Sequence, residues 1–311
     1  MAETIATYSV PEHHVKMYTA NVQAALAKAG GLLMGLVSNS SYTGERAQVV
    51  NFLGPVEFSE RNTPYGDTKV VEIEHTQRWV SGTEYDCAIF IDRLDVLKMI
   101  YEPTSPYVER MREAAARKMD EITMSKFFAT ARTGKDGTTN TPAKATNTVA
   151  HGGTRFTVAK LRALRKLMKK RHLQLRMTKP YIAVTAEQID DLLGEVAVGS
   201  NDYNAVKPLV DGEVSQFMGF VFVPYEDNGT STGGKGIPTS TVAGPATIRQ
   251  CPAWVPDGMH YGAWDSLSIV ISPRPDKNNI KQAHATFTGG ATRLEEDKVF
   301  MLEAVESGTP S

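Results

Sequence analysis

The sequence predicts an α+β protein, with strand-rich segments toward both ends of the chain and a helix–strand–helix unit in the middle. Two runs of alternating apolar and polar residues, 48–58 and 70–80, predict long strands. A long helical pattern follows at 105–130, and the chain from Ala246 onward is again rich in strand-forming residues.

The first predicted elements are a helix and an arm. Residues 11–29 carry apolar side chains at three- and four-residue steps, and Gly30-Gly31 ends the pattern. Residues 32–43 then predict an extended, partly apolar arm.

The two strand-like runs predict a β-hairpin. One face of the first run carries Val50, Phe52, Val56 and Phe58, and 59–67 holds turn-forming residues. Strands of about 10 residues reach about 35 Å. Because a two-stranded hairpin is marginal in water, this one either joins a sheet of its own domain or is covered by a neighbouring chain. We favour the neighbouring chain.

Helices and strands continue along the chain. A short helix is predicted at 92–101, and Ser105-Pro106 supplies an N-cap and a first-turn proline for the helix 105–130, which spans roughly 37 Å and suits a spine. Beyond a loop at 131–153, we expect a helix from the cap Thr157 to about His172, a strand at 181–185, a helix at 186–193, a strand at 216–224, a loop at 228–244, and strands at 267–271, 282–287 and 299–305.

Composition favours a soluble protein that folds in a reducing compartment. The 311 residues are 41 % apolar and 22 % charged, with a formal net charge of −1 and two cysteines, Cys87 and Cys251. The N-terminus does not match a signal peptide, and the most apolar stretch, 24–37, is too short to span a membrane. We therefore expect synthesis in the cytoplasm and no membrane partner.

A basic segment at 155–179 is the strongest charge feature. It holds ten Lys and Arg and no acidic residue, which leaves 24 Lys and Arg against 35 Asp and Glu in the remaining chain, a formal charge of −11. The cluster could bind DNA phosphates without base readout, or acidic surfaces of neighbouring subunits. The candidate contact residues are Arg162, Arg165, Lys166, Lys169, Lys170 and Arg171.

The sequence offers no convincing catalytic, cofactor-binding or metal-binding motif. Residues 229–236 approach the phosphate-binding loop pattern, but Gly236 stands where Ser or Thr must follow Lys235. The seven histidines lack the spacing of a metal site. We expect no enzyme, with a nucleotide-dependent enzyme built around Lys235 as the weaker alternative.

The order of elements and three groups of residues carry a family resemblance. These are 21–23, 35–37, 41–45 and 49–51; then 78–80, 85–88 and 91–95; and, as the closest match, 105–108, 119–122, 127–128 and 130–134. In these stretches the chain resembles the major capsid proteins of tailed bacteriophages, which have the HK97-like fold. The resemblance is strongest over 13–135, recognisable over 155–225 and weaker beyond.

The resemblance implies a structural subunit that forms pentamers and hexamers of an icosahedral head around double-stranded DNA. Portal, scaffolding and possible decoration proteins are further implied partners, and the virion is the implied location after assembly in the host bacterial cytoplasm. The runner-up is a shell protein of the same fold from an encapsulin or a gene-transfer agent. The implied domains are an N-terminal arm (1–45), an extended loop (46–82), a peripheral domain with the spine helix (83–155), an axial domain (156–265) and a C-terminal return to the peripheral domain (266–311).

The tip of the extended loop is implied to contact a neighbouring subunit through Glu60, Arg61, Tyr65 and Asp67. Some members of the family crosslink a lysine of this loop to an asparagine of a neighbour. Here 59–67 contains no lysine, Lys69 lies just beyond it, and no asparagine partner is identifiable. We therefore predict a shell held by non-covalent contacts.

Overall fold

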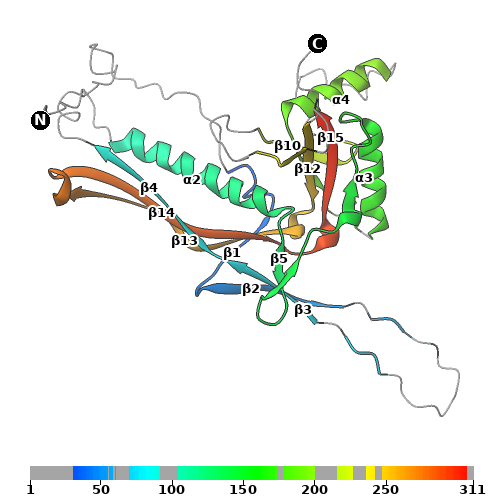
Figure 1. Ribbon diagram of the computed structural model, residues 1–311, viewed down its shortest axis with the longest axis horizontal. Helices are drawn as coiled ribbons and strands as arrows, with labels where there is room; N and C mark the ends of the chain where they lie inside the picture. Colours follow the sequence, from blue (N-terminus) through cyan, green and yellow to red (C-terminus); the bar gives the residue numbers. More distant parts are fainter. Residues whose placement is uncertain are drawn as a thin grey trace, which may run out of the picture.

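The computed structural model describes residues 31–54, 56–58, 60, 70–73, 75–91, 104–171, 173, 175, 178–199, 216–226, 236–241 and 247–306. In this part of the chain, three β-sheets and three α-helices form an elongated molecule (Figure 1). The predicted helices at 11–29 and 92–101 lie outside the described residues.

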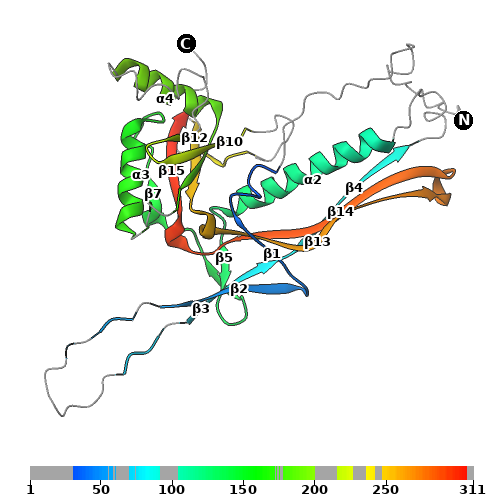
Figure 2. The ribbon, with the colours of Figure 1, turned by 180° about the vertical axis from the view of Figure 1, so that it is seen from behind.

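The first sheet supports the long helix α2 (Thr104–Lys126). Its strands lie in the order β1 (Ser38–Ser41), β13 (Met259–Arg274), β14 (Ile280–Arg293) and β4 (Thr83–Ile91), and only the β1–β13 pair is parallel. Figures 1 and 2 show α2 lying along one face of this sheet. The helix buries Met111, Ala115 and Ile122, the stripe that the spacing predicts.

The second sheet forms a separate body with α3 (Val158–Lys170) and α4 (Ala186–Gly199). Its order is β7 (Thr148–Val149), β15 (Val299–Glu306), β12 (Thr247–Trp254), β8 (Tyr181–Val184), β10 (Phe220–Pro224) and β9 (Gln216–Phe217), with β11 (Thr239–Thr241) on β12. The predicted cap is confirmed, because the Thr157 side chain accepts a hydrogen bond from the Lys160 amide. Leu161, Leu164 and Met168 of α3 are fully buried.

The third sheet forms the root of the hairpin, with the order β2 (Arg46–Leu53), β3 (His75–Ser81), β5 (Ala131–Thr133) and β6 (Thr139–Thr141). The hairpin prediction is confirmed, but the paired strands end at Leu53 and begin at His75. The root thus joins a sheet of its own chain, the alternative that we did not favour. The described residues from Gly54 to Ile73 form no strand. Only this outer part of the hairpin is therefore left without a sheet of its own chain to pair with.

Several predicted bounds differ from the structure. The spine helix ends at Lys126 rather than near residue 130, because Ala131 already belongs to β5. The predicted strand 216–224 is a tight hairpin, in which Met218 and Gly219 adopt positive φ angles of 51° and 83°. The strand 299–305 was expected to return to the sheet of α2, as part of 266–311. Instead β15 pairs with β12 in the second sheet, while β13 and β14 belong to the first.

A shared core joins α2 to the second sheet. Trp254 of β12 is fully buried, and its ring lies 4.7 Å from that of Phe127 just beyond α2. Its Nε1 donates a hydrogen bond of 3.0 Å to the Leu36 carbonyl. Asp120 of α2 accepts hydrogen bonds of 3.0 Å from the amides of Leu32 and Leu33, which fixes the start of the segment that leads to β1.

His260 locks β1 onto β13. The Ser38 hydroxyl donates its single proton to the Met259 carbonyl at 2.9 Å, so it must accept from Nδ1 of His260, also 2.9 Å away. Nε2 is therefore the acceptor for the Tyr42 hydroxyl at 2.9 Å. Burial lowers the pKa of His260 to about 4, which keeps the ring neutral in the folded chain.

The neutral state of His260 predicts a loss of stability in mild acid. Because its folded pKa lies below the usual value of 6.5, the unfolded chain binds a proton first as the pH falls, and stability is lost between about pH 6.5 and 4. The shift corresponds to about 3 kcal/mol at most. In denaturant unfolding at pH 7 and 4.5, His260→Gln should lose less stability than wild type, whereas half-buried His284→Gln should follow wild type. Equal losses in all three proteins would contradict the assignment.

Candidate intersubunit surfaces

The outer part of the hairpin presents apolar side chains to solvent. We call the residues 54–73 the arm, and Figures 1 and 2 show its described parts pointing away from both other sheets. Phe58 is completely exposed, at 104 %, and Val70 is 86 % exposed. The exposed apolar set at the arm and its root is Leu53, Val56, Phe58, Val70, Val71 and Ile73. A contiguous exposed apolar patch marks an interaction surface.

Sequence reasoning identified only part of this surface. It placed Val56 and Phe58 on one hairpin face, but it did not single out Val70, the apolar neighbour of Val71. In an extended chain, adjacent apolar residues indicate that both faces become covered. Of the four predicted tip residues, Glu60 is exposed, and Arg61, Tyr65 and Asp67 lie outside the described residues.

An apolar hollow of about 180 Å³ lies under the first half of α2. Met111, Leu267 and Phe287 supply apolar walls, and the exposed Cys87 and the amphipathic Lys118 also line it. A dry cavity of about 150 Å³ is large enough to bind benzene. The hollow can therefore hold one aromatic side chain.

The root of the arm is fixed by a buried cluster of two arginines and one glutamate. Arg78 of β3 donates to both carboxylate oxygens of Glu296, at 2.9 and 2.8 Å, and to the Leu294 carbonyl. Arg293 of β14 lies 3.6 Å from the same carboxylate and donates to the carbonyls of Phe127 and Ala129 just beyond α2. Burial, with Arg78 nearby, lowers the pKa of Arg293. This cluster was not predicted, since Arg78 lies more than 200 residues before Arg293 and Glu296 in the chain.

The predicted basic cluster divides into two sets. Arg165 donates to the Met218 carbonyl, and Arg171 bonds Asn147 and Thr146 and lies 3.3 Å from Asp297, so these two hold the second body together. Arg162, Lys166, Lys169 and Lys170 are exposed on α3. None of these four has an ion-pair partner among the described residues. They form the basic face of α3.

Two other cations of the basic segment have structural roles. Lys160 is buried, and its Nζ donates to the carbonyls of Thr154 and Glu303 at 2.7 and 2.9 Å. Burial lowers its pKa. Arg155 forms an ion pair of 3.1 Å with Asp191 of α4. Only part of the charge counted in the sequence therefore faces solvent.

The described residues contain no cluster of three or more His, Cys, Asp or Glu that could hold a metal ion. None of their helices combines the length and apolar character needed to cross a membrane. Residues 229–235 of the phosphate-loop-like segment lie outside the described part.

Comparison with protein families gives one match, which covers almost the whole chain. Residues 10–306 match the family described as phage capsid protein. No curated protein matches the sequence.

Solved structures share the fold at low sequence identity. The capsid of cyanophage Pam1 superposes with a TM-score of 0.72 at 11 % identity, covering 99 % of this chain and 100 % of that one. The capsid of cyanophage P-SCSP1u gives 0.65 at 16 % identity, with 94 % and 93 % covered. The capsid of a native GTA particle gives 0.64 at 12 % identity, with 98 % and 100 % covered.

Proposed function

The chain belongs to the phage capsid protein family and is a shell protein with the HK97-like fold, and from this premise we propose that it builds pentamers and hexamers of an icosahedral head around double-stranded DNA. It is a structural protein rather than an enzyme. The observation that carries the proposal is the exposed apolar arm, whose side chains require a neighbour to cover them.

The arrangement of arm and hollow supports assembly into rings. The arm leaves one end of the molecule, whereas the apolar hollow lies under α2 toward the other end (Figures 1 and 2). A contact between unlike surfaces of identical chains repeats head to tail and closes into a ring when the rotation permits. We assign the second sheet with α3 and α4 to the axial domain around the five- and six-fold axes, and the α2 sheet to the peripheral domain.

Electron microscopy of the overexpressed full-length protein tests the proposed function. We expect closed, regular shells built from rings of five and six subunits, and heads filled with DNA when the protein comes from its own particles. On a denaturing gel the shells should give a monomer band without a ladder, because the contacts are non-covalent. A protein that stays monomeric at high concentration would refute the proposal. Small compartments loaded with protein cargo would instead favour an encapsulin-like shell.

The fold match to a GTA capsid keeps a gene-transfer-agent shell as the second candidate. The DNA extracted from the particles separates the two. A single repeated genome indicates a phage, whereas random host fragments indicate a transfer agent. Portal, scaffolding and decoration proteins are proposed partners in the phage case.

A disulfide should trap the arm in the hollow of a neighbour. We propose that Phe58 fills the hollow lined by Cys87 of the next subunit, so Phe58→Cys should crosslink to Cys87 on mild oxidation and give a ladder of oligomers. The other cysteine should stay inert, because burial raises the pKa of Cys251 to about 12. Non-reducing gels read the result.

Two variants control the disulfide experiment. Leu53→Cys, at the end of β2 and about 17 Å from Phe58 along an extended chain, should give no ladder. Phe58→Cys combined with Cys87→Ser should also give none. Shells that form normally without a ladder would contradict this docking site while leaving the shell function intact.

Reversing the charge on the basic face of α3 should impair assembly. A variant with Lys166→Glu, Lys169→Glu and Lys170→Glu together should yield fewer shells. The chain outside 155–179 has a formal charge of −11, so the acidic surfaces of neighbouring subunits should repel the variant helix. The control reverses the exposed Arg112, Lys135 and Lys281, an equal change of charge. Particle yield and DNA content are measured. Shells that close but hold little DNA would assign this face to DNA phosphates, and normal filled shells would exclude both roles.

A further inference from the structure

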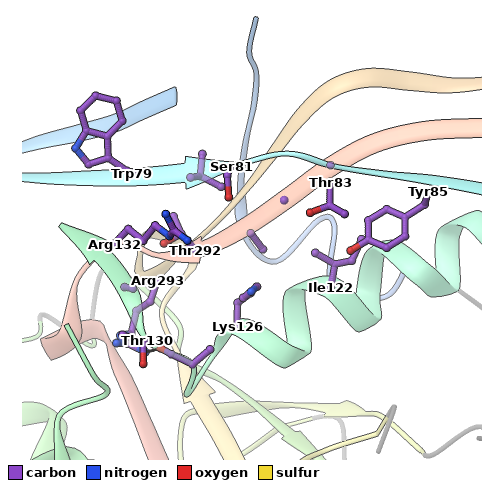
Figure 3. Close-up of a pocket in the computed structure, with 16 residues that line it drawn as sticks. Trp79, Ser81, Thr83, Tyr85, Ile122, Lys126, Thr130, Arg132, Thr292 and Arg293 are labelled. Atoms are coloured by element: carbon purple, nitrogen blue, oxygen red, sulfur yellow. Dashed lines mark hydrogen bonds between the residues drawn. The ribbon is translucent and has the colours of Figure 1, made fainter. Parts of the chain in front are cut away.

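A polar hollow of about 120 Å³ lies at the root of the arm, where β3, β4, β5, β14 and the end of α2 meet (Figure 3). Its volume is enough for several waters or for one tetrahedral oxyanion. Tyr85 lines both this hollow and the apolar one under the first half of α2, but the proposed shell contacts use only the apolar one.

The charges around this hollow are all of one sign. Lys126 at the end of α2, Arg132 of β5 and Arg293 of β14 line it. Of the described residues that line the hollow, none is Asp or Glu. Lys126 and Arg132 repel each other and Arg293, whose only nearby carboxylate among the described residues, Glu296, is shared with Arg78, and an anion between the cations reduces that repulsion.

Hydroxyl groups supply further donors. Five of the lining residues carry one: Ser81, Thr83, Tyr85, Thr130 and Thr292. Figure 3 shows the Lys126 ammonium pointing from α2 toward the strands, with the hydroxyls of Thr83 and Tyr85 turned to the same space. Hydroxyls and ammonium groups together suit the several acceptor oxygens of an oxyanion.

The wall behind the hollow holds uncompensated positive charge. Arg293 is 1 % exposed, and its Nε faces the Glu296 carboxylate at 3.6 Å, too far for a hydrogen bond, so that among the described residues it has no hydrogen-bond partner. Arg293 and Arg78 share the single carboxylate of Glu296, so two buried guanidinium groups face one negative charge. Because water screens buried charges poorly, this excess favours an anion in the adjoining space.

The backbone next to the hollow leaves little freedom to close it. A Cβ built on Gly290 would lie 2.2 Å from the Ser81 carbonyl oxygen, so β14 crosses the end of β3 at backbone contact. The wall that carries Arg293 is therefore fixed against the strand that leads into the arm.

We propose that this hollow binds a small oxyanion, a phosphate or a carboxylate group, through Lys126, Arg132 and the surrounding hydroxyls. The bound anion links the end of α2 to the strands of the arm root, and so fixes the direction in which the arm leaves the body. The oxyanion is either free in solution or carried by an acidic side chain of a neighbouring copy. The chemistry of recognition is the same in both cases.

Calorimetric titration of the full-length protein with inorganic phosphate, at constant ionic strength, tests this site. Unassembled subunits should bind phosphate, and Lys126→Gln with Arg132→Gln should weaken the binding at least about tenfold, since each removes a charge-assisted hydrogen bond. Both side chains are exposed, so the variant should fold. The matched control, Arg112→Gln with Lys135→Gln, removes the same charge from exposed positions outside the hollow and should bind like wild type.

Repeating the titration on assembled shells separates the two sources. Binding by shells as well as subunits indicates a free oxyanion, and binding by subunits alone indicates that a neighbour's carboxylate occupies the site after assembly. Both outcomes support the proposal. Subunits that bind no phosphate, or a control variant that loses binding as much as the double variant, would overturn it.

Discussion

A chain in which residues 54–74 are replaced by an Asn-Gly turn should fold normally and form no closed shells. The turn joins the end of β2 directly to the start of β3, where Leu53 pairs with His75, and a two-residue Asn-Gly connection suits an antiparallel pair. The root sheet of β2, β3, β5 and β6 is kept, and the described residues that are removed take part in no strand.

The size of the expected effect follows from the side chains removed. Burying one Val, Ile or Phe side chain contributes about 1.5–3 kcal/mol. Five of the exposed apolar side chains lie within the deleted residues, so each contact between neighbours loses on the order of 10 kcal/mol of gross burial. Circular dichroism should match wild type, the melting temperature should change by a few degrees at most, and sedimentation should find only unassembled subunits.

A length-preserving variant separates loss of apolar contact from loss of length. Val56→Ser, Phe58→Ser and Val70→Ser together should also prevent shell closure, whereas Glu57→Gln with Glu60→Gln should assemble. If the shortened chain still gave regular particles, the arm would have no part in closing the shell.

The second large effect is expected at Glu296. Glu296→Gln removes the only carboxylate that Arg78 and Arg293 share, and leaves two buried guanidinium groups without a counter-charge. Removing one partner of a buried ion pair costs about 3–5 kcal/mol. Because Glu296 is partly exposed, we expect the substitution to lower the free energy of unfolding by about 3 kcal/mol. Denaturant unfolding of the unassembled subunit measures the loss.

Glu295→Gln is the matched control for this substitution. The neighbouring Glu295 pairs at 3.0 Å with Lys298 near the surface, where an ion pair is worth about 0–1 kcal/mol. If both variants lost the same small amount, the buried cluster would not fix the arm root. Arg78→Met added to Glu296→Gln should recover part of the stability, since it removes one of the two uncompensated charges.

The elements with local signals were predictable from the sequence. The Thr157 cap, the buried stripe of α2 and the alternation in β2 and β3 each depend on residues close together in the chain. No bounds were predicted for β12 within the strand-rich chain from Ala246 onward, and its Pro252 is a residue that central strands disfavour. The structure accommodates this proline on a stretch of strand edge that has no partner: β11 pairs with residues 247–249, and β8 pairs only with Ala253 and Trp254.

The candidate surfaces likewise include features with a local sequence signal and features that depend on tertiary contacts. The apolar alternation at Val56 and Phe58 was visible in the sequence, whereas the Arg78–Arg293–Glu296 cluster depends on contacts between distant segments. The basic segment illustrates the limit of counting charge. Ten cations stand together in sequence, but Lys160, Arg165 and Arg171 are used inside the chain, and only a tertiary structure separates them from the basic face of α3.

The pairing of β1 with β13 has a consequence for the time at which the subunit can fold. Ser38 lies beside His260 in this parallel pair, about 220 residues further along the chain. At roughly 5–20 residues per second, a ribosome needs roughly 10–45 s to make the intervening segment. During that time the early strands β1 and β4 have none of their partners, because β13 and β14 do not yet exist. The nascent chain therefore completes its α2 sheet only near the end of translation. The arm is synthesised before the sheets that fix its direction are complete.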